Sequence, residues 1–242
     1  IVMCAAVSSG AMIIQNNPMF HVNDNTLMNL NILKAAKKNK VKKFIFLSSN
    51  TVYPLSKKPM KENDMNYELF SKYFNVGWMK IFSEKLCEMY KKDMKICIIR
   101  PANLYGPYDK FDPVKSKVIP SLIRKFEKDK IVEVWGSGKD IKDFLYIDDF
   151  VNNLLLIIEK FNKFEILNIS SSKSLSLIKI INILKKINSN KKLKIIFNSN
   201  KPSMIPFRKI SNAKIKKLIN FKLNYNIESG LKETIKWYRK NN

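Results

Sequence analysis

The segment KFIFLSSNTVYP, from Lys43 to Pro54, decides the fold class, because a wholly apolar run ends abruptly in a polar loop. A second run of this kind, MKICIIR from Met94 to Arg100, follows a helical pattern near Asn75–Lys91. Strands that are buried on both faces have continuous apolar runs, and helices that alternate with them are typical of parallel sheets. The sequence around Lys43 therefore predicts an α/β fold with a largely parallel sheet.

The same alternation continues outward from this segment. Upstream, Ile1 to Val7 has the pattern of a buried strand, and a helical pattern spans Pro18 to Asn39. Downstream, we expect helices or strands at residues 116–128, 131–134, 148–161, 165–169, 176–187 and 193–197, and two terminal helices. We predict that the first strand lies beside Phe44–Ser48 in one sheet.

Composition limits the classes of function. The chain has 242 residues, 45% of them hydrophobic, which is enough for one large or two small cores. Its three cysteines form no spaced pair and His21 is the only histidine, so we expect no metal site and no Ser-His-Asp triad. No apolar run reaches the roughly 18 residues that span a bilayer, and no signal peptide is recognisable. We expect a cytoplasmic protein with no membrane partner.

The formal net charge of +25 is the feature that most suggests nucleic acid. Nearly all of this charge is lysine, since the arginines are only Arg100, Arg124, Arg208 and Arg239. The lysines are scattered through every segment instead of gathering on one element, which is typical of solvated surfaces. We therefore expect no nucleic-acid partner, although a basic surface would attract a substrate that carries phosphates.

Four strings, in order along the chain, carry a family resemblance. They are FIFLSSNTVYP at Phe44–Pro54, RPANLYGPYDKFDP at Arg100–Pro113, VWGSGKDIKDFLYIDDF at Val134–Phe150 and KPSMIPFRKIS at Lys201–Ser211. Together they resemble the extended short-chain dehydrogenase/reductases, the NAD-dependent epimerases and dehydratases. Within that family the pattern is most similar to the GDP-L-fucose synthases, and the similarity covers essentially the whole chain.

The resemblance implies a Rossmann-like parallel sheet, incomplete at the N-terminus, with a smaller C-terminal α/β substrate domain. Residues 1–104 and 143–170 would form a partial NAD(P)-binding domain, and residues 105–142 and 171–242 a nucleotide-sugar-binding domain. The cofactor would be NADP or NAD, and the substrate a nucleotide sugar, with a GDP-sugar favoured. A homodimer would form through the helices near Pro18–Asn39 and Asn75–Lys91.

The start of the sequence bears on the cofactor site. The first residue is Ile1, and none of the six glycines forms the G-x-x-G-x-x-G or G-x-G-x-x-G loop that cradles a dinucleotide pyrophosphate. We therefore expect that roughly 60 residues of the fold precede this sequence.

Family chemistry uses a serine and a Y-x-x-x-K pair, in which the tyrosine transfers a proton and the lysine lowers its pKa and binds the nicotinamide ribose. The resemblance places the serine at Ser49 and the lysine at Lys80. Val76 stands four residues before Lys80, and valine cannot transfer a proton. Tyr73 lies seven residues before Lys80, on nearly the same helical face, and is the alternative donor.

Two further positions concern epimerisation. Thr51 stands where the GDP-L-fucose synthases have a cysteine, and Lys117 where they have a histidine. Two hypotheses remain open at this point. The protein is an NAD(P)-dependent nucleotide-sugar epimerase, dehydratase or reductase, or it is a catalytically silent homologue that binds a nucleotide sugar without the catalytic tyrosine.

The resemblance also implies two sets of binding residues. The substrate set is Val118, Leu122, Trp135, Lys142, Lys201 and Arg208. The cofactor set is Ala5, Ala6, Ser48, Lys80, Pro101, Asn103 and Leu104.

Overall fold

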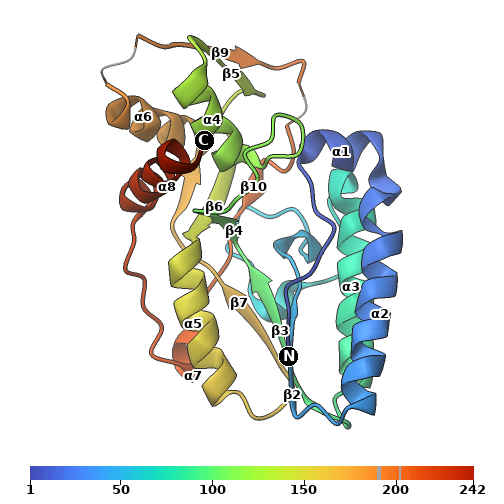
Figure 1. Cartoon of the computed structure of the whole chain (residues 1–242). Helices are drawn as coiled ribbons and strands as arrows, with labels where there is room; N and C mark the ends of the chain where they lie inside the picture. The colour runs from blue at the N-terminus through green and yellow to red at the C-terminus, as the bar shows by residue number, and fades with distance from the viewer. Residues whose placement is uncertain (190–191, 202) are drawn as a thin grey trace.

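The structure, a computed structural model, describes residues 1–189, 192–201 and 203–242 (Figure 1). Its strands are β1 Val2–Met3, β2 Lys43–Leu47, β3 Lys95–Pro101, β4 Asn103–Tyr105, β5 Ile131–Trp135, β6 Ile141–Tyr146, β7 Glu165–Ile169, β8 Ser174–Ser176, β9 Lys194–Asn198 and β10 Phe207–Arg208. Its α-helices are α1 Ala11–Asn16, α2 Asn23–Lys38, α3 Phe74–Met89, α4 Val118–Lys128, α5 Ile147–Lys160, α6 Leu177–Ile187, α7 Ile215–Leu218 and α8 Ile227–Asn241. Short 3₁₀ turns lie at Pro18–His21, Asn50–Val52, Glu62–Asp64 and Ser71–Tyr73.

The main sheet has four parallel strands in the order β1-β2-β3-β7. Val2 lies opposite Ile45, so the predicted pairing of the first strand with Phe44–Ser48 is confirmed. The first strand is shorter than predicted, because the chain leaves the sheet after Met3. Its position at the edge of the sheet explains this, since β1 has one neighbouring strand among the described residues.

Helices cover both faces of this sheet (Figure 1). On one face, α2 and α3 pack side by side over a core that contains Leu33, Phe44, Phe46 and Ile98. On the other face lie α5 and α7, over a core that includes Ile45. Successive residues of β2 thus point into two different apolar layers, which is why its sequence is apolar throughout. The fold class is confirmed as α/β with a Rossmann-like parallel sheet.

A second group of strands lies beyond the carboxyl ends of the main sheet. β6 pairs with β10 and β4 in parallel and with β8 in antiparallel orientation, and β5 pairs with β9. Helices α4, α6 and α8 contribute to one apolar core with β5 and β6. The sequence pattern does not predict β4, β6, β8, β10 or α1, because these elements are short and β6 carries Lys142 and Asp143 in its middle. No helix within the described ranges is long and apolar enough to cross a membrane.

Candidate active site

The carboxyl ends of the parallel strands bring part of the predicted cofactor set together. Ser48 and Ser49 directly follow β2, and the Ser48 backbone N–H donates to the Ile99 carbonyl of β3 at 2.8 Å. Ala5 and Ala6 follow β1, and both are exposed. In open parallel sheets, ligands bind outside the carboxyl ends of the strands. These residues therefore border the edge at which such a fold takes a ligand.

Lys80 reaches the same edge from α3. Its Nζ donates to the carbonyl of Leu47, the last residue of β2, at 2.8 Å, and lies 4.9 Å from the ring centroid of Phe46. Burial lowers the pKa of Lys80 to about 8, although the nearby Glu84 carboxylate opposes this shift. The structure thus holds a part-buried amine, with its pKa lowered to about 8, against the carbonyl of Leu47, which lies two residues before Ser49.

A buried ion pair fixes this corner of the fold. Glu84, one turn after Lys80, accepts hydrogen bonds from Arg100 Nε at 2.9 Å and Nη2 at 2.6 Å and also from the Ser48 hydroxyl. The side chains of Arg100 and Glu84 are only 1% and 4% exposed. The pair ties α3 to the ends of β2 and β3, and so holds Lys80 in place relative to Ser49.

A pocket of about 290 Å³ lies between α1, α4 and β5 and collects most of the predicted substrate set. The predicted residues that line it are Lys117, Val118, Leu122, Trp135 and Lys142. Lys201 lies beside it, with its Nζ 5.9 Å from the Trp135 ring centroid. A pocket with apolar walls, an aromatic ring and several lysines suits a ligand that has both a planar ring and phosphates.

Lys142, one of these lysines, forms a long ion pair. Lys142 Nζ lies 3.6 Å from Asp140 Oδ2, and that oxygen also accepts a hydrogen bond from the Ser203 hydroxyl at 2.7 Å. Burial lowers the pKa of Lys142. A buried cation whose counter-ion is this distant can gain from an anionic ligand.

The two sites are contiguous through the chain that follows β1. Ala11 and Met12, at the start of α1, line the pocket. A side chain at Gly10 would come within 2.5 Å of the Ser116 carbonyl oxygen, so the backbones of these two segments are in close contact. The segment after Ala5 and Ala6 therefore runs from the sheet edge to the wall of the pocket.

Comparison with known proteins agrees with this geometry. Residues 1–170 match the model of the NAD dependent epimerase/dehydratase family. The chain belongs to this family. It is 30% identical over 226 residues to the GDP-L-fucose synthase of Sinorhizobium fredii (strain NBRC 101917 / NGR234). The match covers 89% of this chain and 71% of that protein.

Two solved structures of the family show the same fold. The UDP-glucose 4-epimerase of Thermotoga maritima with UDP-glucose has a TM-score of 0.87 and 26% identity, and the match covers 99% of this chain and 76% of the epimerase. The UDP-glucuronic acid 4-epimerase of Bacillus cereus, in complex with UDP-glucuronic acid and NAD, has a TM-score of 0.85 and 25% identity. That match covers 98% of this chain and 74% of the epimerase.

The residues at the sheet edge fit the cofactor of this family. An ammonium group has three donors, and Lys80 uses one of them on Leu47, which leaves two for the hydroxyls of a nicotinamide ribose. Ser49 Oγ accepts the Thr51 backbone N–H at 3.1 Å, so its own proton remains available for an acceptor. Asn50 Nδ2 donates to the Pro101 carbonyl at 2.9 Å and joins the ends of β2 and β3.

Val76 and Tyr73, the two positions considered for the proton donor, lie in different surroundings. Val76 lines a recess of about 350 Å³ with Ile14 and Pro18. Tyr73 lies against the C-terminal part of the chain, where the Ile205 backbone N–H hydrogen-bonds to its hydroxyl oxygen. Burial raises the pKa of Tyr73 to about 12, so it stays protonated.

Of the remaining predicted residues, Arg208 and Asn103 hydrogen-bond to backbone carbonyls. The Thr51 hydroxyl is buried with no hydrogen-bond partner in the described part of the chain. Arg208 is 2% exposed and donates to the carbonyls of Tyr53 at 3.0 Å and Pro54 at 3.1 Å, outside the substrate pocket. Asn103 Nδ2 donates to the Asp143 carbonyl at 2.8 Å, and Leu104 follows it in β4.

Sequence reasoning missed several residues of the pocket wall: Ala11, Met12, Ser121, Lys125, Glu133, Asp140, Ser203 and Met204. Helical spacing could have found Ser121 and Lys125, which are three and seven residues after Val118. The alternation of a strand could have found Glu133, two residues before Trp135. Ala11 and Met12 reach the pocket only through the tertiary fold.

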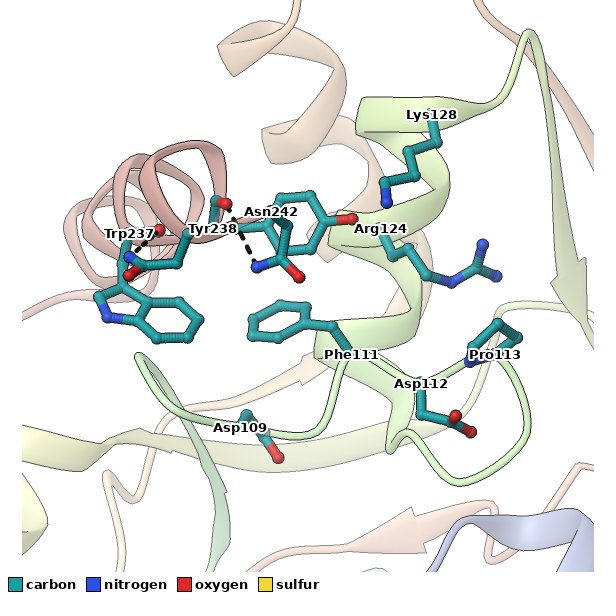
Figure 2. Close-up of a pocket in the computed structure, with 10 residues that line it drawn as sticks. Asp109, Phe111, Asp112, Pro113, Arg124, Lys128, Trp237, Tyr238 and Asn242 are labelled. Atoms are coloured by element: carbon teal, nitrogen blue, oxygen red, sulfur yellow. Dashed lines mark hydrogen bonds between the residues drawn. The ribbon is translucent and has the colours of Figure 1, made fainter.

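A second pocket, of about 530 Å³, lies on another side of α4 (Figure 2). Arg124 and Lys128 border it, together with Phe111 and Trp237, whose rings are stacked at 5.8 Å. None of the predicted site residues is among those that line it. We therefore assign the candidate active site to the sheet edge and the smaller pocket.

Proposed function

We propose that this protein is an NAD(P)-dependent nucleotide-sugar reductase or epimerase, with a GDP-sugar as its favoured substrate. The observation that carries the proposal is the continuity of a nicotinamide-type edge, built on Ser49 and Lys80, with a lysine-rich pocket around Trp135. Ala11 and Met12 line the pocket on the side of the sheet edge. A cofactor at the edge and a nucleotide sugar in the pocket would therefore meet near these two residues.

Each residue has a role in the proposed reaction. The bound nicotinamide supplies or accepts the hydride. Ser49 donates a hydrogen bond to the sugar carbonyl oxygen and so stabilises the charge that develops there. Lys80 holds the ribose, and because its pKa is about 8 it can also give the proton that the missing tyrosine would give. Val118, Leu122, Trp135, Lys142 and Lys201 hold the nucleotide.

Thr51 and Lys117 are the proposed acid–base residues of an epimerisation step. Lys117 borders the pocket at the start of α4. Burial raises the pKa of the half-buried Asp109 carboxyl, and the nearby Lys117 charge opposes this shift.

A second function is favoured by one observation. Val76 removes the family's proton donor, and Tyr73 has its hydroxyl against Ile205. A homologue that binds a nucleotide sugar without turnover would keep the pocket and lose the chemistry.

Oxidation of NADPH or NADH with a panel of 4-keto nucleotide sugars tests the proposal. We expect oxidation that depends on the keto sugar and is lost in Lys80→Met. Tight nucleotide-sugar binding with no oxidation for any member of the panel would instead support the silent homologue.

We also propose a homodimer, supported by exposed apolar side chains on the helices α2 and α3. Their exposed fractions are Leu27 61%, Leu30 42%, Phe74 56%, Trp78 39%, Phe82 47% and Met89 73%. Phe74, Trp78 and Phe82 are spaced four residues apart and therefore form one stripe. A surface of this kind is usually covered by a partner.

Two further parts of the proposal concern organisation and location. We propose that residues 1–104 and 143–170 bind the cofactor and that residues 105–142 and 171–242 bind the nucleotide sugar. The separate apolar core of α4, α6 and α8 supports this division. We propose a cytoplasmic location, supported by three cysteines that are free thiols, namely Cys4, Cys87 and Cys97.

A further inference from the structure

One face of β5 carries a carboxylate into the substrate pocket. Glu133 and Trp135 are two residues apart in β5, so their side chains share a face of the strand, and both line the pocket. Val132 and Val134, the residues on either side of Glu133, are buried in the apolar core and alternate with it along the strand. The strand therefore separates a polar, ligand-facing side from a packed side.

The Glu133 carboxylate is held by two neighbours. Asn198 Nδ2 donates to Oε1 at 2.6 Å, and Trp135 Nε1 donates to Oε2 at 3.1 Å. An ionised carboxylate has about four lone-pair positions, so roughly two are left for a ligand. The hydrogen bond from Asn198 also lowers the pKa of Glu133, which keeps the group an acceptor.

A carboxylate is an unexpected group in a pocket that would take a diphosphate. It repels the phosphates, and this repulsion is unfavourable unless the ligand also offers hydrogen-bond donors. Lys125 and Lys201 lie close enough to lower the pKa of Glu133, and Lys142 supplies a third positive charge for the phosphates. The base is the part of the nucleotide farthest from the phosphates, and it can supply such donors to Glu133.

We propose that Glu133 determines base specificity by accepting hydrogen bonds from N1–H and N2–H of guanine. Guanine presents two adjacent donors on its Watson–Crick edge, which match the two oxygens of a carboxylate. Uracil and thymine have one N–H between two carbonyl oxygens, and adenine and cytosine set an acceptor beside their amino group, so each would place an acceptor against the carboxylate. The inference rests on the proposed function, because it requires a nucleotide in this pocket.

The walls of the pocket are consistent with a base at this position. Val118 and Leu122, four residues apart on α4, supply apolar contacts, and the Trp135 ring lies on the same side of β5 as the carboxylate. The hydrogen bond between Trp135 Nε1 and Glu133 also fixes the ring relative to the base-reading group.

Titration calorimetry of the intact protein with GDP, IDP and UDP tests the proposal. IDP lacks only the 2-amino group of GDP, so the ratio of their affinities reports on one of the two proposed hydrogen bonds. We expect the wild type to bind GDP about tenfold or more tightly than IDP or UDP. In Glu133→Gln, which keeps one acceptor and adds a donor, we expect this preference to shrink to about twofold or less while UDP affinity is retained.

The outcomes separate the possible failures. If Glu133 only positions Trp135, Glu133→Gln weakens GDP and IDP equally, their ratio stays at the wild-type value, and the proposal is overturned. Equal binding of GDP, IDP and UDP by the wild type overturns it while leaving the proposed function intact. Failure to bind any of the three overturns both. Glu159→Gln, which removes an exposed carboxylate on α5, is the matched control and should keep the wild-type ratio.

Discussion

Val76 and Lys80 lie one helical turn apart on α3, and we propose that Val76 occupies the position of the family's catalytic tyrosine. The recess beside Val76, of about 350 Å³, gives a larger side chain room. We predict that Val76→Tyr raises the rate of hydride transfer by ~10²–10⁴-fold, because it restores a proton donor beside a cation that lowers its pKa. Stopped-flow measurement of NADPH oxidation checks this.

Tyr73→Phe is the companion variant for this prediction. We expect it to change the rate little, since the Tyr73 hydroxyl is engaged at Ile205. If Tyr73→Phe abolishes activity and Val76→Tyr leaves it unchanged, then Tyr73 is the donor.

Lys80 should also give the reaction a distinctive pH dependence. Its pKa is lowered from 10.5 to about 8, so it is an ammonium below pH 8 and a neutral amine above. Because the proposed role needs the protonated form, we predict that kcat/KM for carbonyl reduction falls as pH rises through about 8. Lys85→Met, on the exposed side of α3, should keep the same profile. A profile that stays level up to the pH at which an ordinary lysine titrates would contradict the role.

At the scale of single residues, positions within recognisable sequence motifs could be predicted, and positions that depend on distant tertiary contacts could not. The family resemblance predicts Ser49 and Lys80 as site residues, and the structure brings both to the end of β2. Asp140 and Glu133 act through partners such as Ser203 and Asn198, which are 63 and 65 residues away in sequence. Nothing local in the sequence indicates such pairs.

Among the elements, α3 is joined to β3 by a buried ion pair between Glu84 and Arg100. Glu84→Gln would leave the Arg100 guanidinium, which is 1% exposed, without its counter-ion. We predict that this lowers the free energy of unfolding by about 3–5 kcal/mol. Urea denaturation followed by circular dichroism checks the value.

Glu88 on the same helix provides the matched control. It pairs with Lys85 and Lys91 at a side-chain exposure of 37%, so Glu88→Gln should change stability by less than about 1 kcal/mol. Equal effects of the two substitutions would show that the buried pair does not stabilise this corner.

The long elements could be predicted from the sequence. Their helices repeat an apolar pattern over several turns, and their buried strands are continuous apolar segments. The helix predicted near Asn75–Lys91 is observed at Phe74–Met89, and the strand predicted at Glu165–Ile169 is observed with the same bounds. β6 was not predicted, because Lys142 and Asp143 interrupt its apolar pattern. Their burial is stabilised by tertiary partners, Asp140 for the lysine and Ser171 for the aspartate.

For the whole molecule, the exposed apolar side chains on α2 and α3 predict a dimer that introduced charge can disrupt. We expect the double variant Leu27→Glu, Phe82→Glu to be monomeric by light scattering at micromolar concentration, because it puts carboxylates into an apolar contact. Leu155→Glu is the matched control, since Leu155 is 54% exposed but lies on α5. A wild type that is already monomeric would contradict the proposed interface.

The central claim is that the protein moves a hydride between a nicotinamide and a nucleotide-bound sugar. The most direct measurement is mass spectrometry of the sugar product after reaction with NADPH deuterated at C4, using preparations of each C4 stereoisomer in turn. The account predicts that one of the two preparations transfers deuterium to the sugar carbon, in the wild type and more rapidly in Val76→Tyr. A product that carries no deuterium from either preparation, or no product at all from a protein that binds GDP, would contradict it.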